Sequence, residues 1–212
     1  MDFVYVGGET TQTIRKLNTT DLVQVTESAG YGGDIYALTV DASFVYMGGL
    51  TTQTVKKLRK SDLAVVATSP NYGGGIRSLG NDAGFVYVGG AALVVKKLQK
   101  SNLAVVVTSA GLGGSILGLT AEDASFVYTS GSDNFARKLQ KSDLAVVALS
   151  ADYGGQIQSI TEDSGFIYIG GTTTNRVKKL QKSDLAQVAQ SANLGANVLA
   201  LTEDASFVYA AR

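Results

Sequence analysis

The apolar residues of this chain fall in short runs, and segments rich in glycine, serine and aspartate separate one run from the next. Valine, tyrosine, phenylalanine and alanine dominate the runs, and the first three favour β-strands. No apolar stripe with the 3.6-residue period of a helix is present. Residues 44–84 show the pattern most clearly, with apolar runs at 44–49, 54–58, 63–68 and 76–79. This pattern predicts four short strands joined by turns, and no helix.

The same pattern recurs along the whole chain. Each copy begins with Phe-Val-Tyr or Phe-Ile-Tyr, and the phenylalanines are 41, 41, 41, 40 and 41 residues apart. A fixed period of this size is typical of a repeat architecture. We therefore predict a single domain, residues 1–212. Its repeats span residues 3–43, 44–84, 85–125, 126–165 and 166–206, and an extra strand follows at 207–212.

Four short strands in about 40 residues predict one blade of a β-propeller. Strands such as residues 144–149, Leu-Ala-Val-Val-Ala-Leu, are apolar on both faces. Blades that stack face to face around an axis bury both faces, whereas a two-sheet sandwich would need alternating apolar and polar positions. We predict an all-β fold: a five-bladed β-propeller of four-stranded repeats, its ring closed by strands from both termini.

The strand count predicts how the ring closes. The closing blade would take its inner strand, residues 198–201, from the C-terminus and its third and outer strands, residues 13–28, from the N-terminus. The Phe-Val-Tyr strand has two candidates for one position, residues 3–8 and 207–211. Three interpretations stay open: one copy lies outside the blade, the spare strand pairs with another molecule by strand exchange, or the chain is part of a larger ring. We expect a monomer, with a strand-exchanged oligomer as the alternative.

The repeat resembles the YVTN and quinoprotein-like β-propeller repeats. The resemblance rests on Val-Tyr-Val-Gly-Gly at 86–90, Val-Lys-Lys-Leu at 95–98, and Lys-Ser-Asp followed by Leu-Ala-Val-Val-Ala-Thr at 60–68, and it extends over the whole chain. It implies a propeller fold, whose members serve as binding platforms, surface-layer proteins and, in some cases, quinone enzymes. The tryptophan motifs of true quinoproteins and the Trp-Asp dipeptide of the related repeat class are absent. The similarity of the repeats also suits an engineered or recently amplified protein.

Composition narrows the chemistry. The chain has 18 basic and 18 acidic residues, so no net field attracts nucleic acid or an anionic membrane. It contains no cysteine, histidine or tryptophan, which removes thiolate and imidazole catalysis and metal binding through these groups. No signal peptide or membrane-spanning run is visible, and we take a cytoplasmic location as the default. We predict no enzymatic activity, no cofactor, and no nucleic-acid or membrane partner.

One face of the propeller carries the candidate site. Strands alternate in direction, so the loops entering the inner strands share a face with those following the Phe-Val-Tyr strands. Each entry loop holds Tyr-Gly-Gly or a variant of it, which suggests ligand pockets between blades with an aromatic wall and amide donors. The structural alternative is that the glycines permit a tight turn while tyrosine or leucine plugs the blade junction, and their interchange favours this alternative. The candidate residues are Tyr31, Tyr72, Leu112, Tyr153 and Leu194, together with Asp34, Tyr36, Arg77, Gln156 and Asn197, which differ most between copies.

Other sequence features add little chemistry. Adjacent acids such as Glu122 and Asp123 lie in predicted turns and are interpreted as turn residues. The lysines of the Val-Lys-Lys-Leu strands are expected to lie at the outer edge of the blade with their amines in water. We predict a non-enzymatic repeat scaffold that binds a protein or ligand through the Tyr-Gly-Gly face. The alternative is a lectin-like module with several equivalent glycan sites between blades.

Overall fold

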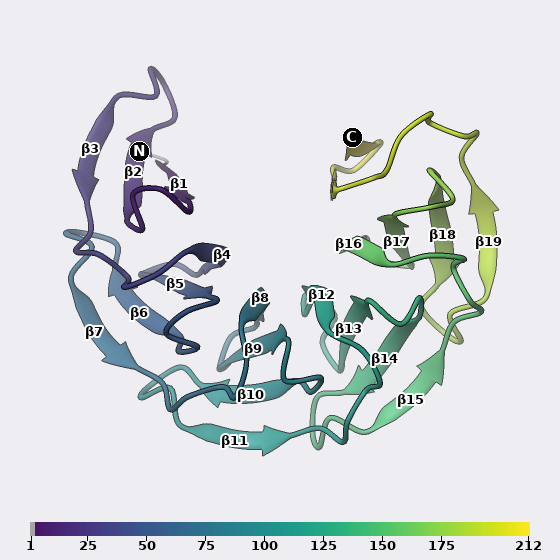
Figure 1. Cartoon of the computed structure of the whole chain (residues 1–212), viewed down its shortest axis with the longest axis horizontal. Coiled ribbons are helices and arrows are strands. Elements are labelled where there is room, and N and C mark those ends of the chain that lie inside the picture. Colours follow the sequence, from purple (N-terminus) through teal and green to yellow (C-terminus); the bar gives the residue numbers. More distant parts are fainter. Residues whose placement is uncertain (1–2) are drawn as a thin grey trace.

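The computed structural model describes residues 3–212, and these form β-strands and no helix, as the sequence predicted. Every strand pair is antiparallel and joins neighbours in the chain, so each sheet is a simple meander. The sheets stand around a common axis in an open arc, from β1–β3 in purple to β20 and β21 in yellow (Figure 1). The all-β propeller arrangement is therefore confirmed.

Four complete sheets hold four strands each, in the order inner, second, third and outer. They consist of β4 (Ile35–Val40), β5 (Phe44–Gly49), β6 (Lys56–Arg59) and β7 (Val65–Thr68); β8 (Ile76–Asn81), β9 (Phe85–Gly90), β10 (Lys96–Gln99) and β11 (Val105–Thr108); β12 (Ile116–Thr120), β13 (Phe126–Gly131), β14 (Ala136–Gln140) and β15 (Val146–Leu149); and β16 (Ile157–Glu162), β17 (Phe166–Gly171), β18 (Val177–Gln181) and β19 (Gln187–Gln190).

The two ends of the arc carry incomplete sheets. The N-terminal sheet consists of β1 (Phe3–Gly7), β2 (Ile14–Asn18) and β3 (Gln24–Glu27), and the C-terminal hairpin consists of β20 (Ala200–Glu203) and β21 (Val208–Ala211). The sequence predicted that residues 198–201 would join residues 13–28 in one closing blade. That pairing is not formed, and no closed ring is present among the described residues. The duplicated second strand contributes to this, because β21 pairs with β20 along the edge that β1 would otherwise occupy, while β1 stays at the edge of its own sheet.

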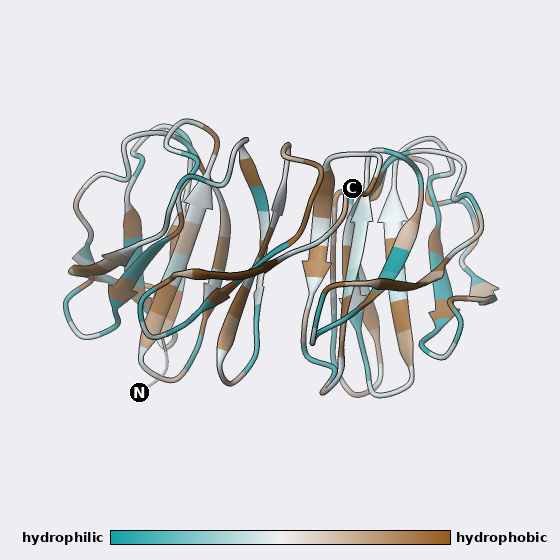
Figure 2. Ribbon diagram, turned by 90° about the horizontal axis from the view of Figure 1, so that it is seen from below, coloured by the Kyte–Doolittle hydropathy of each residue, from teal (hydrophilic) through white to brown (hydrophobic). Residues whose placement is uncertain are grey.

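The hydrophobic core lies between successive blades. At one junction, Tyr46 from β5 is fully buried in a cluster with Leu98 and Leu103 of the following blade. Three further clusters repeat this arrangement at the other junctions between blades. Apolar segments accordingly lie along the strands, with hydrophilic segments in many of the connecting loops (Figure 2). Burial of both sheet faces explains the lack of alternation in second strands such as β9. The outer strand β15 was expected from the sequence to be buried on both faces, and this prediction is wrong: Val146, Val147 and Leu149 are 44–51% exposed, because no further strand or blade covers the outside of the arc.

A leucine in the turn between the third and outer strands marks each junction. Leu63, Leu103, Leu144 and Leu185 have φ angles of 57–63°, a left-handed conformation that is uncommon for a residue with a branched side chain. Each of the four side chains is 0–1% exposed. Burial against the preceding blade thus accompanies a strained backbone, which persists only where its surroundings over-determine it.

The lysines of the third strands do not extend into water as expected. The lysine directly before the leucine of the third strand is only 7–9% exposed in four repeats: Lys16, Lys57, Lys97 and Lys138. Its ammonium lies 3.8–3.9 Å from the centre of the phenylalanine ring of its own blade. It also donates a hydrogen bond of 2.7–2.8 Å to a backbone carbonyl in the turn of the next blade. The ammonium can be buried because the carbonyl and the ring face replace much of its hydration.

The second glycine of each Gly-Gly pair permits close contact with the inner strand. A Cβ atom on Gly49 would lie 1.7 Å from the carbonyl oxygen of Asp34, whereas one on Gly111 would meet nothing within 4 Å. We expect Gly49→Ala to lower the free energy of unfolding by about 1–3 kcal/mol through overpacking, measured by urea denaturation. Gly111→Ala is the matched control and should change the free energy by less than about 1 kcal/mol. Equal effects of the two substitutions would contradict the close contact.

Candidate functional site

The aromatic residues of the entry loops are structural plugs in this structure. Tyr31, Tyr72 and Tyr153 are 1–3% exposed, and Leu112, at the equivalent position, is 4% exposed. The three hydroxyls each donate a 2.5 Å hydrogen bond to the carbonyl of Thr54, Val94 or Arg176 respectively. These rings have no free face for a ligand. The structural alternative considered from the sequence therefore describes them better than a ligand-pocket wall does.

The glycines beside these plugs have the expected conformation. Gly32, Gly73, Gly113, Gly154 and Gly195 have φ angles between 79° and 96°, a region that residues with a Cβ rarely occupy. The loop needs this conformation to turn from the outer strand into the inner strand. The glycines are thus explained by backbone geometry without a bound ligand.

The remaining candidate residues lie in the inner strands or shortly before them. We call this set the inner rim: Asp34, Tyr36, Arg77, Gln156 and Asn197. Tyr36 is 42% exposed, and Arg77, Gln156 and Asn197 are also exposed. The guanidinium of Arg77 lies 6.0 Å from the centre of the Tyr36 ring. The Tyr36 hydroxyl donates to Glu9 Oε1 (2.5 Å), and this bond is the main reason why the pKa of Tyr36 is raised. The structure thus brings Tyr36 and Arg77 together at an accessible surface.

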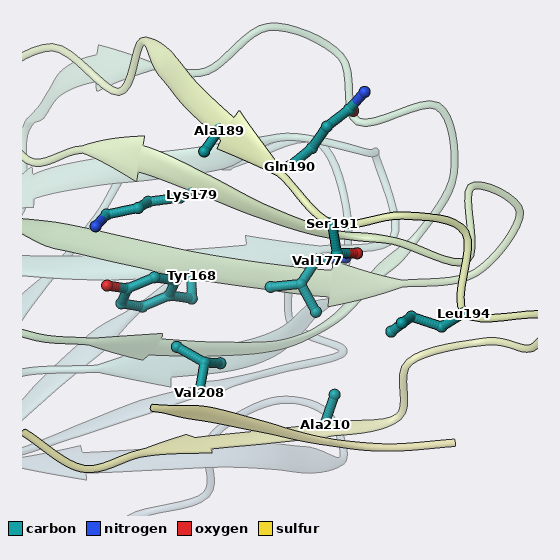
Figure 3. Close-up of a pocket in the computed structure, with 9 residues that line it drawn as sticks. All are labelled: Tyr168, Val177, Lys179, Ala189, Gln190, Ser191, Leu194, Val208 and Ala210. Carbon is teal, nitrogen blue, oxygen red and sulfur yellow. The ribbon is translucent and has the colours of Figure 1, made fainter. Parts of the chain in front are cut away.

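Leu194, the fifth of the entry-loop candidates, differs from the plugs because it is only half-buried. It lines an apolar cleft of about 290 Å³ between β16–β19 and the C-terminal hairpin (Figure 3). The other lining residues are Tyr168, Val177, Lys179, Ala189, Gln190, Ser191, Val208 and Ala210. Sequence reasoning missed this cleft, because several of its lining residues, such as Tyr168 and Val177, belong to repeat positions that are buried in the complete junctions.

On the opposite face, an aspartate in each turn between inner and second strands organises a hydrogen-bond network. Asp41 Oδ1 accepts from the backbone N–H groups of Ser43 and Phe44, and Asp41 Oδ2 accepts from the Tyr46 hydroxyl. Lys100 of the next blade lies 3.1 Å from the same carboxylate. Asp82 with Lys141 (3.0 Å) and Asp123 with Lys182 (3.9 Å) repeat the arrangement. The sequence identified these acids as turn residues but did not show that they join adjacent blades.

The hydrogen bonds of these turns shift several pKa values. Burial would raise the pKa of Asp41, but the donated hydrogen bonds outweigh it and lower the pKa to about 2. The same balance lowers the pKa values of Asp82, Asp123 and Asp163. The pKa of Tyr168 is raised to about 12, first by burial and then by its bond to Asp163. The hydrogen bonds of the turns therefore keep these aspartates ionised to a lower pH than in the unfolded chain.

This arrangement predicts acid sensitivity. A carboxyl with a folded-state pKa below its unfolded value of about 3.9 stabilises the fold above that value and loses its contribution as pH falls through the folded pKa. We expect the free energy of unfolding to decrease between about pH 4 and about pH 2, measured by urea denaturation at several pH values. The raised pKa of Glu203 has the opposite sign, but it is one carboxyl against the four aspartates with lowered pKa values. A constant stability across this range would contradict the network.

The acids nearest the C-terminus surround a second cleft, of about 570 Å³, lined by Glu122, Asp123, Glu162, Asp163, Glu203 and Asp204 among others. Glu162 is 3% exposed, lies 2.7 Å from Lys182, and accepts hydrogen bonds from the Thr120 hydroxyl and the Glu122 amide. Within residues 3–212, no group of three acidic side chains has the geometry to hold a metal ion. The contacts of Glu162 lie within the protein.

Comparison with known proteins shows the fold alone. No protein-family model matches the chain, and no curated protein matches it by sequence. The WD40 β-propeller domain of Doa1 matches in structure with a TM-score of 0.83 and 14% identity, over 94% of this chain and 68% of that chain. The computationally designed Ika8 protein matches with a TM-score of 0.77 and 12% identity, over 99% of this chain and 77% of that chain. The described residues also contain no helix long and apolar enough to cross a membrane.

Proposed function

We propose that this chain is a non-enzymatic repeat scaffold that binds a single polypeptide partner through the inner rim. The observation that carries the proposal is the contrast between the rim and the remainder of the repeat. Core, turn and junction residues recur from blade to blade, whereas the inner strands lie side by side and bring different exposed residues to one surface. An asymmetric surface of this kind suits one asymmetric partner better than several identical small ligands.

Tyr36 and Arg77 supply the chemistry for this contact. Tyrosine and arginine are enriched among residues that dominate binding at protein interfaces, and both are exposed here. The guanidinium can form two parallel hydrogen bonds to a carboxylate. We therefore expect the partner to present an acidic side chain to Arg77 and an apolar group to the Tyr36 ring.

Peptide selection tests the proposal. The folded chain is used to select from a random peptide library, and the affinity of enriched peptides is measured by calorimetry. Arg77→Ala and Tyr36→Ala are each expected to weaken binding at least about tenfold, the cost of one interface anchor. Val106→Thr, on the outer strand where Val106 is 50% exposed, is the matched control. Failure to enrich acidic peptides, or equal affinity for all three variants, would contradict the proposal.

The lectin-like alternative gains no support from these contacts. It needs accessible aromatic faces at equivalent positions between blades, and Tyr72 and Tyr153 are buried there. Binding on a glycan array that weakens on Tyr72→Leu, a substitution that resembles the natural Leu112, would revive this alternative.

The proposal also includes the origin of the repeat, its type and the number of blades. The repeated hydrogen bonds at successive junctions support a repeat that was amplified or engineered as a unit, and a designed protein is among the structural neighbours. Assignment to the YVTN type rests on the sequence resemblance alone. A count of five blades holds only if the strands at the two ends of the arc together form one blade.

A further inference from the structure

The two ends of the arc present complementary halves of the junction that repeats between blades. We propose that copies of this chain join head to tail, with the β20 strand of one copy pairing with β1 of the next to complete a four-stranded blade. The inference concerns the blade ends and does not depend on what the inner rim binds.

The N-terminal sheet exposes residues that are buried in every complete blade. Val4 and Val6 of β1 are 40% and 46% exposed. The equivalent residues of the complete blades are Val45 and Met47, Val86 and Val88, Val127 and Thr129, and Ile167 and Ile169. All eight are 0–1% exposed, because a preceding blade or their own inner strand covers them.

Leu22 shows the same contrast more strongly. It has the left-handed backbone conformation of the junction leucines, with a φ of 55°, but its side chain is 63% exposed. In the complete blades, the leucine at this position is buried against the tyrosine of the preceding blade. At Leu22 the strained turn is kept without the burial that accompanies it elsewhere, so the turn is already shaped for a missing neighbour.

The C-terminal end provides the matching cavity. Tyr168, Val177, Ala189 and Leu194 line the apolar cleft, and they correspond to Tyr128, Ala136, Ala148 and Tyr153 at the preceding junction. At that preceding junction, Leu180 and Leu185 of the next blade fill the equivalent space. Their counterparts in the N-terminal sheet are Leu17 and Leu22. The cleft thus has the lining of a junction whose leucine pair is supplied from the other end of a chain (Figure 3).

Backbone hydrogen bonding fits in the same way. In the complete blades, the residue after the glycine pair donates its N–H to the carbonyl of the residue before the inner strand, as Ala91 does to Gly75 (2.9 Å) and Thr172 does to Gln156 (2.9 Å). The corresponding donor in the N-terminal sheet is Glu9. The corresponding acceptor is Asn197, just before the C-terminal inner strand. The candidate residue Asn197 thereby acquires a structural role.

Charged groups complete the match. At the junction between β4–β7 and β8–β11, Lys100 pairs with Asp41, and Tyr46 donates to the same carboxylate. Lys60 and Tyr5 occupy the corresponding positions at the N-terminal end, and Asp204 occupies the position of Asp41 in the C-terminal hairpin. Joining two copies would place the Asp204 carboxylate beside Tyr5 and Lys60.

The glycines select β1 over β21 as the second strand of the composite blade. A Cβ atom on the second glycine of the complete blades would lie 1.7–2.4 Å from the carbonyl that precedes the inner strand. The equivalent residue is Gly8 after β1 but Arg212 after β21. Gly8 has open space around it in this structure. Since Phe207 and Tyr209 are 65% and 52% exposed, displacing β21 loses little burial.

The curvature of the arc favours a second copy over the chain's own N-terminal sheet. The two ends lie on opposite sides of the opening in Figure 1. The arc superposes on only 68% of the Doa1 propeller domain, so its blades are set at the angle of a longer ring. Closing five blades within one chain would change the packing at four filled junctions, whereas head-to-tail joining leaves them unchanged. Such contacts form rings or open chains, depending on whether the rotation closes.

Light scattering of the full chain, from low micromolar to near-millimolar concentration, tests the proposal. We expect the mass to rise to two or more copies. Leu22→Lys should remain monomeric with an unchanged circular dichroism spectrum, because Leu22 is exposed in the single chain. Val106→Lys, also on an exposed site, should assemble like the original. A monomer at every concentration, or assembly that Leu22→Lys leaves intact, would overturn the proposal.

A mixing experiment tests the direction of joining. Leu22→Lys blocks the N-terminal end and Val177→Lys blocks the cleft, so neither variant should assemble alone. An equimolar mixture should form a heterodimer and nothing larger, because it offers one intact end of each kind. If Val177→Lys fails to fold, Asp204→Lys serves in its place, since Asp204 contacts its own turn at the surface. Larger oligomers, or no complex between two folded variants, would contradict head-to-tail joining.

Discussion

Leu103→Ala is expected to lower the free energy of unfolding by about 2–5 kcal/mol, the range for deleting a buried leucine side chain. Leu103 is 0% exposed and packs in the junction between β4–β7 and β8–β11, with Tyr46 and Leu98 in the same cluster. Alanine would leave a cavity there while keeping the strained φ of 59°. Urea denaturation followed by circular dichroism measures the change.

Leu22→Ala is the matched control, because it changes the same residue in the same turn without a neighbouring blade. At a concentration where the chain is monomeric, we expect it to change stability by less than about 1 kcal/mol, as for most exposed sites. Equal losses for the two substitutions would mean that the turn itself, and not burial between blades, is responsible.

Asp82→Ala is expected to cost about 3 kcal/mol, because it removes the shared acceptor of several groups. The Asp82 carboxylate accepts from the Gly84 and Phe85 amides and from the Tyr87 hydroxyl, and Lys141 of the next blade lies 3.0 Å away. The Tyr87 side chain is fully buried, so its hydroxyl would lose its partner in a poorly solvated place. Thermal and urea unfolding measure the loss.

Two substitutions separate the contributions. Asp82→Asn keeps an oxygen for the turn amides but removes the charge beside Lys141, so it should cost less than alanine and flatten the fall in stability between about pH 4 and about pH 2. Asp143→Ala removes an exposed aspartate that accepts only from the Ala145 amide, and it should cost about 1 kcal/mol or less. If Asp143→Ala were as damaging as Asp82→Ala, the junction network would not be the cause.

Two kinds of residue in the repeat differ in their consequence for function: those at the junctions between blades and those of the inner rim. The junction leucines, lysines and turn aspartates hold blades together and leave little of their surface for a ligand. Tyr36 and Arg77 of the inner rim do not hold blades together, so the residue types at these positions can differ between repeats without loss of stability. A scaffold built this way can acquire a binding surface residue by residue.

The sequence was sufficient for the repeat, the strands and the fold class. Residues such as Phe85 to Gly90 recur at a nearly constant spacing, and β-propensity together with turn glycines is local information. It also suggested the correct alternative for Tyr72, because exchange with Leu112 pointed to volume and not to an aromatic face. The buried lysines could not be predicted in this way. The acceptor of Lys97 is a carbonyl 44 residues away, and only the packing of two blades brings them together.

The sequence by itself determined that the chain has five inner strands but six Phe-Val-Tyr strands, since both are counted directly from the repeat. One blade therefore has two candidates for its second strand. Only the tertiary structure decided that β1 and β21 each keep their own partner and that the ring stays open. The physical reason is that backbone pairing within each end is satisfied locally, whereas closure depends on the angle set by side-chain packing at every junction. That angle is a property of the assembled core, and it leaves Leu22 exposed at one end and the cleft beside Tyr168 unfilled at the other.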